Sequence, residues 1–200
     1  MKKQILIATR NQGKIKEIRE FLNEEFEILG LDDFEIKHEV EETGTTFKEN
    51  AIKKAKEYGE ISNIMTISDD SGLVVDILDG EPGVYSARYG GEELTDEERT
   101  NLLLNNLKDF KQKELTARFC CVIAVWAPNK KIKTFCGTIE GQISTIARGN
   151  NGFGYDPIFY YPPKGKNLAE ITLQEKQEIS HRSKAVFKAV KYIKEINKYE

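Results

Sequence analysis

Four groups of residues along the chain have types and spacings that could do chemistry. The first joins a short apolar stretch to an amphipathic one, and its members are Thr9, Arg10, Asn11, Gln12, Gly13 and Lys14. A strand that leads into a helix N-terminus presents free backbone N–H groups and a positive dipole end, so it favours an anion. Lys14 adds a point charge suited to phosphate. The spacing is not that of a Walker A loop, and an ordinary turn with a solvated lysine explains it equally well.

The second group is acidic and consists of Glu41, Glu42, Asp69 and Asp70. The last two follow the apolar residues 64–68, and α/β enzymes place functional side chains at the ends of such strands. Because successive strand residues point to opposite faces, at most one of the two is expected to face a site. Two histidines and no clustered cysteines give no zinc-type ligand set. Carboxylates suit Mg²⁺ instead, and two solvated acidic loops are the alternative.

The third group is a glycine-rich run made of Gly152, Phe153, Gly154, Tyr155 and Asp156. Glycine lets the backbone approach a ligand closely, and an aromatic ring between two glycines could lie flat on a planar base. Asp156 could accept a hydrogen bond from a base or a ribose. The alternative is a tight turn with Phe153 packed into the core.

The fourth group lies near the C-terminus and consists of Lys176, Ser180, His181 and Arg182. Ser180 is a natural N-cap, so His181 and Arg182 fall in the first turn of a helix. Cations oppose the helix dipole at that end, and an anionic ligand would explain why they are there. Two exposed charges are the alternative.

Elements that could position these groups follow from hydrophobic periodicity and end signals. We expect strands at residues 3–9, 26–31, 64–68, 73–78, 116–126, 131–139 and 141–146. Helices are expected from the turn at 11–13 to about residue 26, after the capping boxes that begin at Thr46, Thr95 and Thr172, and from Ser180 onward. This order predicts an α/β fold, a mixed sheet with flanking helices, in one domain over residues 1–200. Any internal boundary is expected near residue 80.

Composition limits the class of protein. The chain has 200 residues, a net charge of −3 and 39% hydrophobic residues, which excludes a disordered chain and a general nucleic-acid coat. The cysteines at 120, 121 and 136 suggest free thiols and a cytoplasmic location. The longest apolar run, residues 119–127, is too short to cross a membrane.

Taken together and in order, the segments ATRNQGK, EETGTTFKENA, SDDSGLVVDILDGEPGVYSARYGG, GFGYDPIF and ISHRSKA closely resemble the inosine triphosphate pyrophosphatase family. The resemblance extends over residues 5–189. It implies an elongated α/β fold of two lobes with the nucleotide in a cleft between them. It also implies Mg²⁺-dependent hydrolysis of ITP, dITP and XTP to the monophosphate and pyrophosphate by a cytoplasmic homodimer.

The resemblance also implies roles for single residues. Residues 9–14 would hold the triphosphate, although Arg10 stands where relatives often have glycine. Asp70 would be the catalytic carboxylate that binds metal and activates water, with Glu41 as a second metal-linked acid and Glu42 as the alternative to it. Ser71 would contact substrate. The base pocket would be lined by Phe153, Gly154, Tyr155 and Asp156, and completed by Lys176, His181 and Arg182.

Selection of deaminated purines should depend on the 6-position, where an oxygen acceptor replaces the amino donor of adenine. A site that donates hydrogen bonds to that oxygen leaves its donors unpaired when adenine binds. His181, Arg182 and the backbone amides near Phe153 are the predicted donors. Two rival functions are a Maf-type pyrophosphatase with another base preference and a nucleotide- or RNA-binding regulator without turnover.

Overall fold

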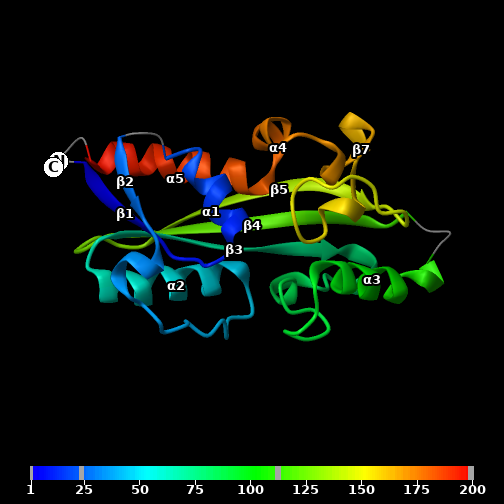
Figure 1. Cartoon of the computed structure of the whole chain (residues 1–200), viewed down its shortest axis with the longest axis horizontal. Coiled ribbons are helices and arrows are strands. Elements are labelled where there is room, and N and C mark those ends of the chain that lie inside the picture. The colour runs from blue at the N-terminus through cyan, green and yellow to red at the C-terminus, as the bar shows by residue number, and fades with distance from the viewer. Residues whose placement is uncertain (1, 23–24, 111–113, 198–200) are drawn as a thin grey trace. The chain divides into compact units, whose positions relative to one another are not determined.

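The structure is a computed structural model that describes residues 2–22, 25–110 and 114–197 (Figure 1). These residues form a seven-stranded sheet with the strand order β2-β1-β3-β4-β5-β6-β7. β2 and β3 pair parallel with β1, whereas β6 pairs antiparallel with β5 and β7. The predicted mixed sheet with flanking helices is therefore confirmed. The strands are β1 (Lys3–Ile7), β2 (Phe26–Leu29), β3 (Met65–Val75), β4 (Thr116–Trp126), β5 (Lys133–Ile143), β6 (Phe159–Tyr161) and β7 (Lys166–Asn167), and the helices are α1 (Gln12–Arg19), α2 (Phe47–Ser62), α3 (Asp96–Asn106), α4 (Leu173–Ile179) and α5 (His181–Asn197).

The chain divides into two compact units. Unit 1 comprises Met1–Ser71, Cys121–Gly137 and His181–Glu200, and unit 2 comprises Gly72–Cys120 and Thr138–Ser180. Each unit has its own buried apolar residues and its own share of the predicted site residues.

Unit 1 has helices on both faces of its strands. In Figure 1, α1 and α5 lie on one side of β1 and β3, and α2 lies on the other. Ile5 and Ile7 belong to a buried cluster with residues of α1 and α5, whereas Leu6 and Ala8 belong to a cluster with Tyr58 of α2. A strand covered on both faces must be apolar at every position, which explains the unbroken aliphatic run of β1.

β3 is one strand over Met65–Val75, so the prediction of two strands at 64–68 and 73–78 is wrong. The polar residues between them suggested a turn. They remain in the strand because other elements supply partners: the Ser68 hydroxyl donates to the Ala51 carbonyl (2.5 Å), and Asp69 and Asp70 pair with lysines. Buried polar groups with such partners do not interrupt a strand.

Two further element boundaries differ from the prediction. α1 ends at Arg19 rather than near residue 26, because the chain turns there through bonds from the Phe21 and Leu22 amides to the Ile18 and Arg19 carbonyls. Residues 23–24, which the predicted helix included, lie outside the described residues. The predicted strand at 141–146 is the end of β5, which continues unbroken to Ile143. The three predicted capping boxes are confirmed at α2, α3 and α4.

Unit 2 has its own buried apolar cluster. It includes Leu103 of α3, Phe119 of β4 and Ile139 of β5, together with Ile158 and Phe159. The Phe119 and Phe159 rings lie 4.7 Å apart, centroid to centroid. None of the described helices is long and apolar enough to traverse a membrane.

Candidate functional site

Residues 9–14 form the predicted strand-to-helix turn in unit 1. Asn11 is the N-cap of α1, and its side chain accepts a hydrogen bond from the Lys14 amide (3.0 Å). The Ile15 amide donates to the Asn11 carbonyl. The four N–H groups before this first helical bond are those of residues 11–14. The Asn11 amide donates to the Thr9 hydroxyl and the Lys14 amide to the Asn11 side chain, so among the described residues the Gln12 and Gly13 amides remain for a ligand, next to the Lys14 side chain.

The alternation of β3 sends its two aspartates to opposite faces of the sheet. Asp69 lies on the face covered by α1 and α5, where its carboxylate contacts Lys14 and Arg182. Asp70 lies on the face covered by α2, where its carboxylate contacts Lys54. Both carboxylates are buried. The expectation that at most one of them faces any given site agrees with this arrangement.

The Asp69 carboxylate is contacted by four donor groups, which come from α1, β3, β4 and α5. Its Oδ1 contacts the Lys14 ammonium and accepts from the Ser71 hydroxyl (3.0 Å), while its Oδ2 accepts from Arg182 Nε (3.0 Å) and the Cys121 thiol (3.0 Å). Burial alone would raise the pKa of Asp69, but the charges of Arg182 and Lys14 hold it well below its usual range. Asp69 is therefore a fixed anion that orients Lys14 and Ser71.

Asp70 has a different environment. Its Oδ1 lies 3.2 Å from the Lys54 ammonium, whereas its Oδ2 is buried and has no hydrogen-bond partner among the described residues. Burial raises the pKa of Asp70 to about 6, the nearby Lys54 opposes that rise, and the charge of Glu42 adds to it. A carboxylate with one unused oxygen and a pKa near neutrality suits metal binding or proton transfer.

The acid that shares Lys54 with Asp70 is Glu42, since the Lys54 ammonium contacts the carboxylates of both. Glu41 is exposed, and its backbone carbonyl accepts from Lys53 Nζ (2.7 Å). The arrangement thus favours Glu42 over Glu41 as the second acid of this group.

The donor set fits Mg²⁺. Within the described part of the chain, no three His, Cys, Asp or Glu side chains gather to hold a metal by themselves. Mg²⁺ usually takes only one or two protein carboxylates and completes its shell with water and substrate phosphates. The unused Oδ2 of Asp70, with Glu42 on the same lysine, matches that requirement.

The glycine-rich group lies in unit 2 and is centred on a buried ion pair. Lys176 Nζ lies 2.6 Å from Asp156 Oδ2, and the Phe153 amide donates to the same oxygen (3.0 Å). Lys176 Nζ also lies 5.1 Å from the centre of the half-buried Phe153 ring. Gly152 has φ +80°, and a Cβ there would lie 2.0 Å from Asp156 Oδ2. The group thus presents an ammonium, a carboxylate and a ring face together.

Some predicted donors are occupied by protein partners. All three nitrogens of the Arg182 guanidinium have them: Nε contacts Asp69, Nη1 contacts Glu17 and Nη2 donates to the Ser71 hydroxyl (2.9 Å). The Phe153 and Gly154 amides donate to Asp156 and Asp96. Buried Arg182 and His181 lie in unit 1, and Lys176 lies in unit 2. Tyr155 is a core residue whose hydroxyl donates to the Ser86 carbonyl (3.0 Å).

The Arg10 side chain makes a contact within the protein, since its Nη2 donates to the Ile36 carbonyl (2.6 Å). It borders a pocket of about 680 Å³ whose other lining residues are Asp32, Glu35, Ile36, Lys37 and Glu39. Thr9 lies at the start of the turn, where its hydroxyl accepts from the Asn11 amide (3.2 Å).

These networks also contain Glu17, Lys54, Asp96 and Cys121, none of which was predicted as a site residue. Lys54 had a signal, because it falls on the inward face of α2 between Ala51 and Ala55, where a lysine needs an acidic partner. Glu17 pairs with a residue 165 positions away, which no local pattern indicates.

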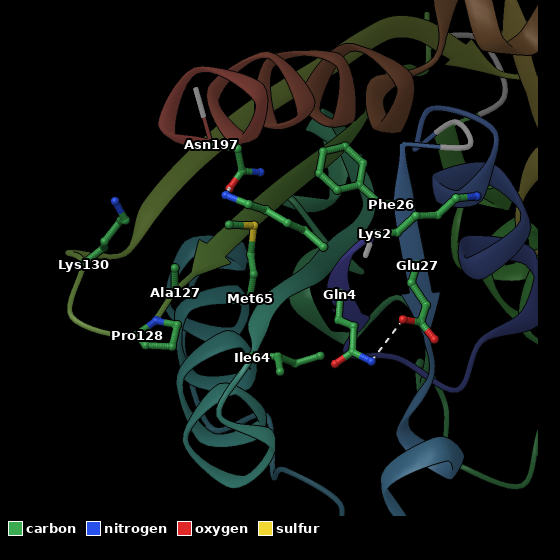
Figure 2. A pocket seen from close by; sticks show the side chains of 11 residues that line it. Lys2, Gln4, Phe26, Glu27, Ile64, Met65, Ala127, Pro128, Lys130 and Asn197 are labelled. Atoms are coloured by element: carbon green, nitrogen blue, oxygen red, sulfur yellow. Dashed lines mark hydrogen bonds between the residues drawn. The ribbon is translucent and has the colours of Figure 1, made fainter. Parts of the chain in front are cut away.

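A larger pocket of about 890 Å³ contains none of the predicted residues (Figure 2). It lies where β1, β2 and β3 begin. The Gln4 side chain on β1 donates to the Glu27 carboxylate on the neighbouring strand β2 (3.1 Å), a bond drawn as a dashed line in Figure 2. Residues 9–14 follow the other end of β1. Open α/β sheets bind ligands beyond the carboxyl ends of their strands, so this pocket is not the candidate site.

Comparisons with known proteins support the sequence resemblance. The model of the Ham1 family matches residues 5–192. The chain is 47% identical to the dITP/XTP pyrophosphatase of Geobacter sulfurreducens over 184 residues, 92% of each chain. It is 46% identical to the dITP/XTP pyrophosphatase of Bacillus subtilis over 192 residues, 96% of this chain and 97% of that one.

Comparison with solved structures points to the same family. The Ham1 protein of Staphylococcus aureus matches with a TM-score of 0.87 and 42% identity, over 96% of this chain and 98% of its own. A HAM1 protein from Coxiella burnetii matches with a TM-score of 0.89 and 38% identity, over 96% and 99%. The family predicted from the sequence is confirmed, and the chain belongs to the Ham1 family.

Proposed function

We propose that this chain hydrolyses deaminated purine nucleoside triphosphates (ITP, dITP and XTP) to the nucleoside monophosphate and pyrophosphate, with Mg²⁺ as cofactor. The observation that carries the proposal is Asp70, a buried carboxylate with an unused oxygen and a pKa of about 6. The names of the relatives and the α1 start with its two available amides support it.

Asp70 acts as the base in this proposal. A water oxygen attacks the α-phosphorus, the bond from that phosphorus to the bridging oxygen breaks, and pyrophosphate leaves. The attacking water gives its proton to Asp70. Lys14 and the Gln12 and Gly13 amides bind the phosphate oxygens, whose charge must be neutralised for the bond to break. Asp69 keeps Lys14 in place.

Asp70 and Glu42 would hold Mg²⁺ together with phosphate oxygens. When bound, the ion neutralises phosphate charge and lowers the pKa of a coordinated water. Lys54 contributes by holding the two carboxylates on one ammonium while no cation is bound.

Base recognition is assigned to the group in unit 2. Lys176 is a donor held between the Asp156 carboxylate and the Phe153 ring. A donor at this place suits the 6-oxygen of hypoxanthine or xanthine, whereas the 6-amino group of adenine would offer it no acceptor. The Phe153 ring offers a face for stacking.

The test is product analysis with a panel of triphosphates. The purified chain should release pyrophosphate from ITP, dITP and XTP in the presence of Mg²⁺, much faster than from ATP, and chelation of Mg²⁺ should stop the reaction. Release of orthophosphate would contradict the proposal. A preference for another base would favour the Maf-type alternative, and binding without turnover would favour a regulator.

We also propose a homodimer in the cytoplasm. Four large apolar side chains of the described residues are more than half exposed, at Ile61, Tyr85, Ile146 and Phe187, and a second copy of the chain would cover such surface. The three free cysteines suit a reducing compartment. Light scattering that gives twice the mass of the chain would support the dimer, and a single-chain mass would contradict it.

A further inference from the structure

The segment that carries Glu42 has no regular backbone pairing of its own. Residues 36–44 form neither helix nor strand. Side chains of other elements fix its backbone instead: Arg10 donates to the Ile36 carbonyl (2.6 Å), and the Tyr58 hydroxyl accepts from the Val40 amide (3.0 Å). Three residues of α2, Asn50, Lys53 and Lys54, make further contacts close to Glu42.

Two adjacent lysines of α2 hold Glu42 in different ways. Lys54 contacts its carboxylate. Lys53 Nζ donates to the Glu41 carbonyl (2.7 Å) and to the Thr43 hydroxyl (3.2 Å), so one ammonium bonds the residues on both sides of Glu42. Lys53 therefore fixes the backbone, while Lys54 fixes the side chain.

The loop is also hydrogen-bonded to α2 at its C-terminal end, at Gly44. The Gly44 amide donates to Asn50 Oδ1 (2.7 Å). Removal of the Lys53 ammonium would leave the backbone around Glu42 with three hydrogen bonds: the local one from the Thr43 amide to the Glu41 carbonyl (3.1 Å), and those at Val40 and Gly44 on either side.

We infer that Lys53 is a positioning residue for the divalent cation: it bonds the backbone on both sides of Glu42 and so fixes where that carboxylate stands beside Asp70. This inference rests on the proposed function. Without Lys53, the loop has to be ordered when the cation binds, and the entropy of that ordering weakens binding. The loss should fall mainly on the Mg²⁺ requirement rather than on turnover at saturating Mg²⁺.

The test compares Lys53→Met, which keeps the apolar stem, with Lys53→Arg, which keeps a charged donor. Lys56→Met is the matched control on the same helix, because Lys56 is exposed and its ammonium lies 3.9 Å from the likewise exposed carboxylate of Glu60. Two readouts need no turnover: the rise of the thermal midpoint with Mg²⁺ concentration, and amide exchange of residues 41–44 without metal.

Lys53→Met should weaken Mg²⁺ binding by about 3- to 10-fold, the effect of losing a partly exposed charged hydrogen bond. It should also speed exchange at residues 41–44. Lys53→Arg should keep most of the Mg²⁺ affinity and most of the exchange protection at residues 41–44. Lys56→Met should match wild type in both measurements. A Lys53→Met protein with wild-type Mg²⁺ binding and exchange would overturn the inference. A wild-type protein that binds Mg²⁺ but releases no pyrophosphate would instead overturn the proposed function, and the Lys53 readouts would still stand.

Discussion

At the scale of single residues, the two neighbouring aspartates of β3 have identical side chains but opposite shifts in pKa, because their surroundings differ. Asp69 is surrounded by cations and donors and stays ionised, whereas Asp70 is buried with one oxygen unused. The sequence predicted that they face opposite ways, because strand geometry requires it. It could not predict their partners, since these come from helices far away in the chain.

Asp70→Asn should make the metal-free protein more stable above pH 6. The pKa of Asp70 is about 6 in the folded chain, above the ordinary 3.8 of an aspartate, so the folded state binds the proton more tightly than the unfolded state. Ionisation of Asp70 therefore lowers stability as pH rises through this range, and the penalty disappears as pH falls towards 4. The gain at pH 8 should be about 1–3 kcal/mol.

Urea unfolding at pH 8 and pH 4, in chelator, measures this difference. Turnover by the same variant should fall at least about 100-fold, because the proposed base is lost. A variant that is less stable than wild type at pH 8, or one that retains full turnover, would contradict the role given to Asp70. Asp76→Asn is a control for a carboxylate of similar type that is partly exposed and paired with Arg118 in unit 2.

At the scale of elements, the sequence predicted helix starts better than strand ends. The capping boxes at Thr46, Thr95 and Thr172 are local, because the two reciprocal hydrogen bonds join residues three apart. β3 was predicted as two strands because its polar residues are satisfied only by tertiary partners. The contact of α2 with residues 41–44 was not predicted either, and neither was the place of Lys54 on the inward face of that helix.

Gly44→Ala should detach the loop from α2. An added Cβ would lie 2.6 Å from Asn50 Oδ1 and 2.7 Å from Glu49 Cβ, so either the loop or the helix start must shift. We expect a loss of about 1–3 kcal/mol in unfolding free energy and weaker Mg²⁺ binding. Gly30→Ala is the control, because a Cβ there would meet only Asp33 Oδ2, at 3.7 Å. Equal midpoints of urea unfolding for the two variants would show that the close approach at Gly44 is unimportant.

At the scale of the whole molecule, the predicted site residues fall into two groups, one in each unit. Unit 1 contains residues 9–14, Asp69, Asp70 and Arg182. Unit 2 contains the glycine-rich run and Lys176. The order of motifs in the sequence was sufficient to predict the family, since several specific segments had to occur together. It could not predict that Arg182 pairs with Glu17 and Asp69, because both partners lie more than 100 positions away.

This division predicts that variants in unit 2 will change the preference among bases, whereas variants in unit 1 will change the rate with every nucleotide. Lys176→Gln should lower the preference for ITP over ATP by at least about 10-fold, because the ammonium donor proposed for the 6-oxygen is lost while an amide can still donate to Asp156. Lys14→Met should lower kcat/KM for ITP, XTP, GTP and ATP by a similar factor each, because every substrate has the same triphosphate. Steady-state kinetics with the four nucleotides, with the fold of each variant checked by circular dichroism, measure both effects. If Lys14→Met changed the base preference as much as Lys176→Gln does, recognition of the base and of the phosphates could not be assigned to separate units.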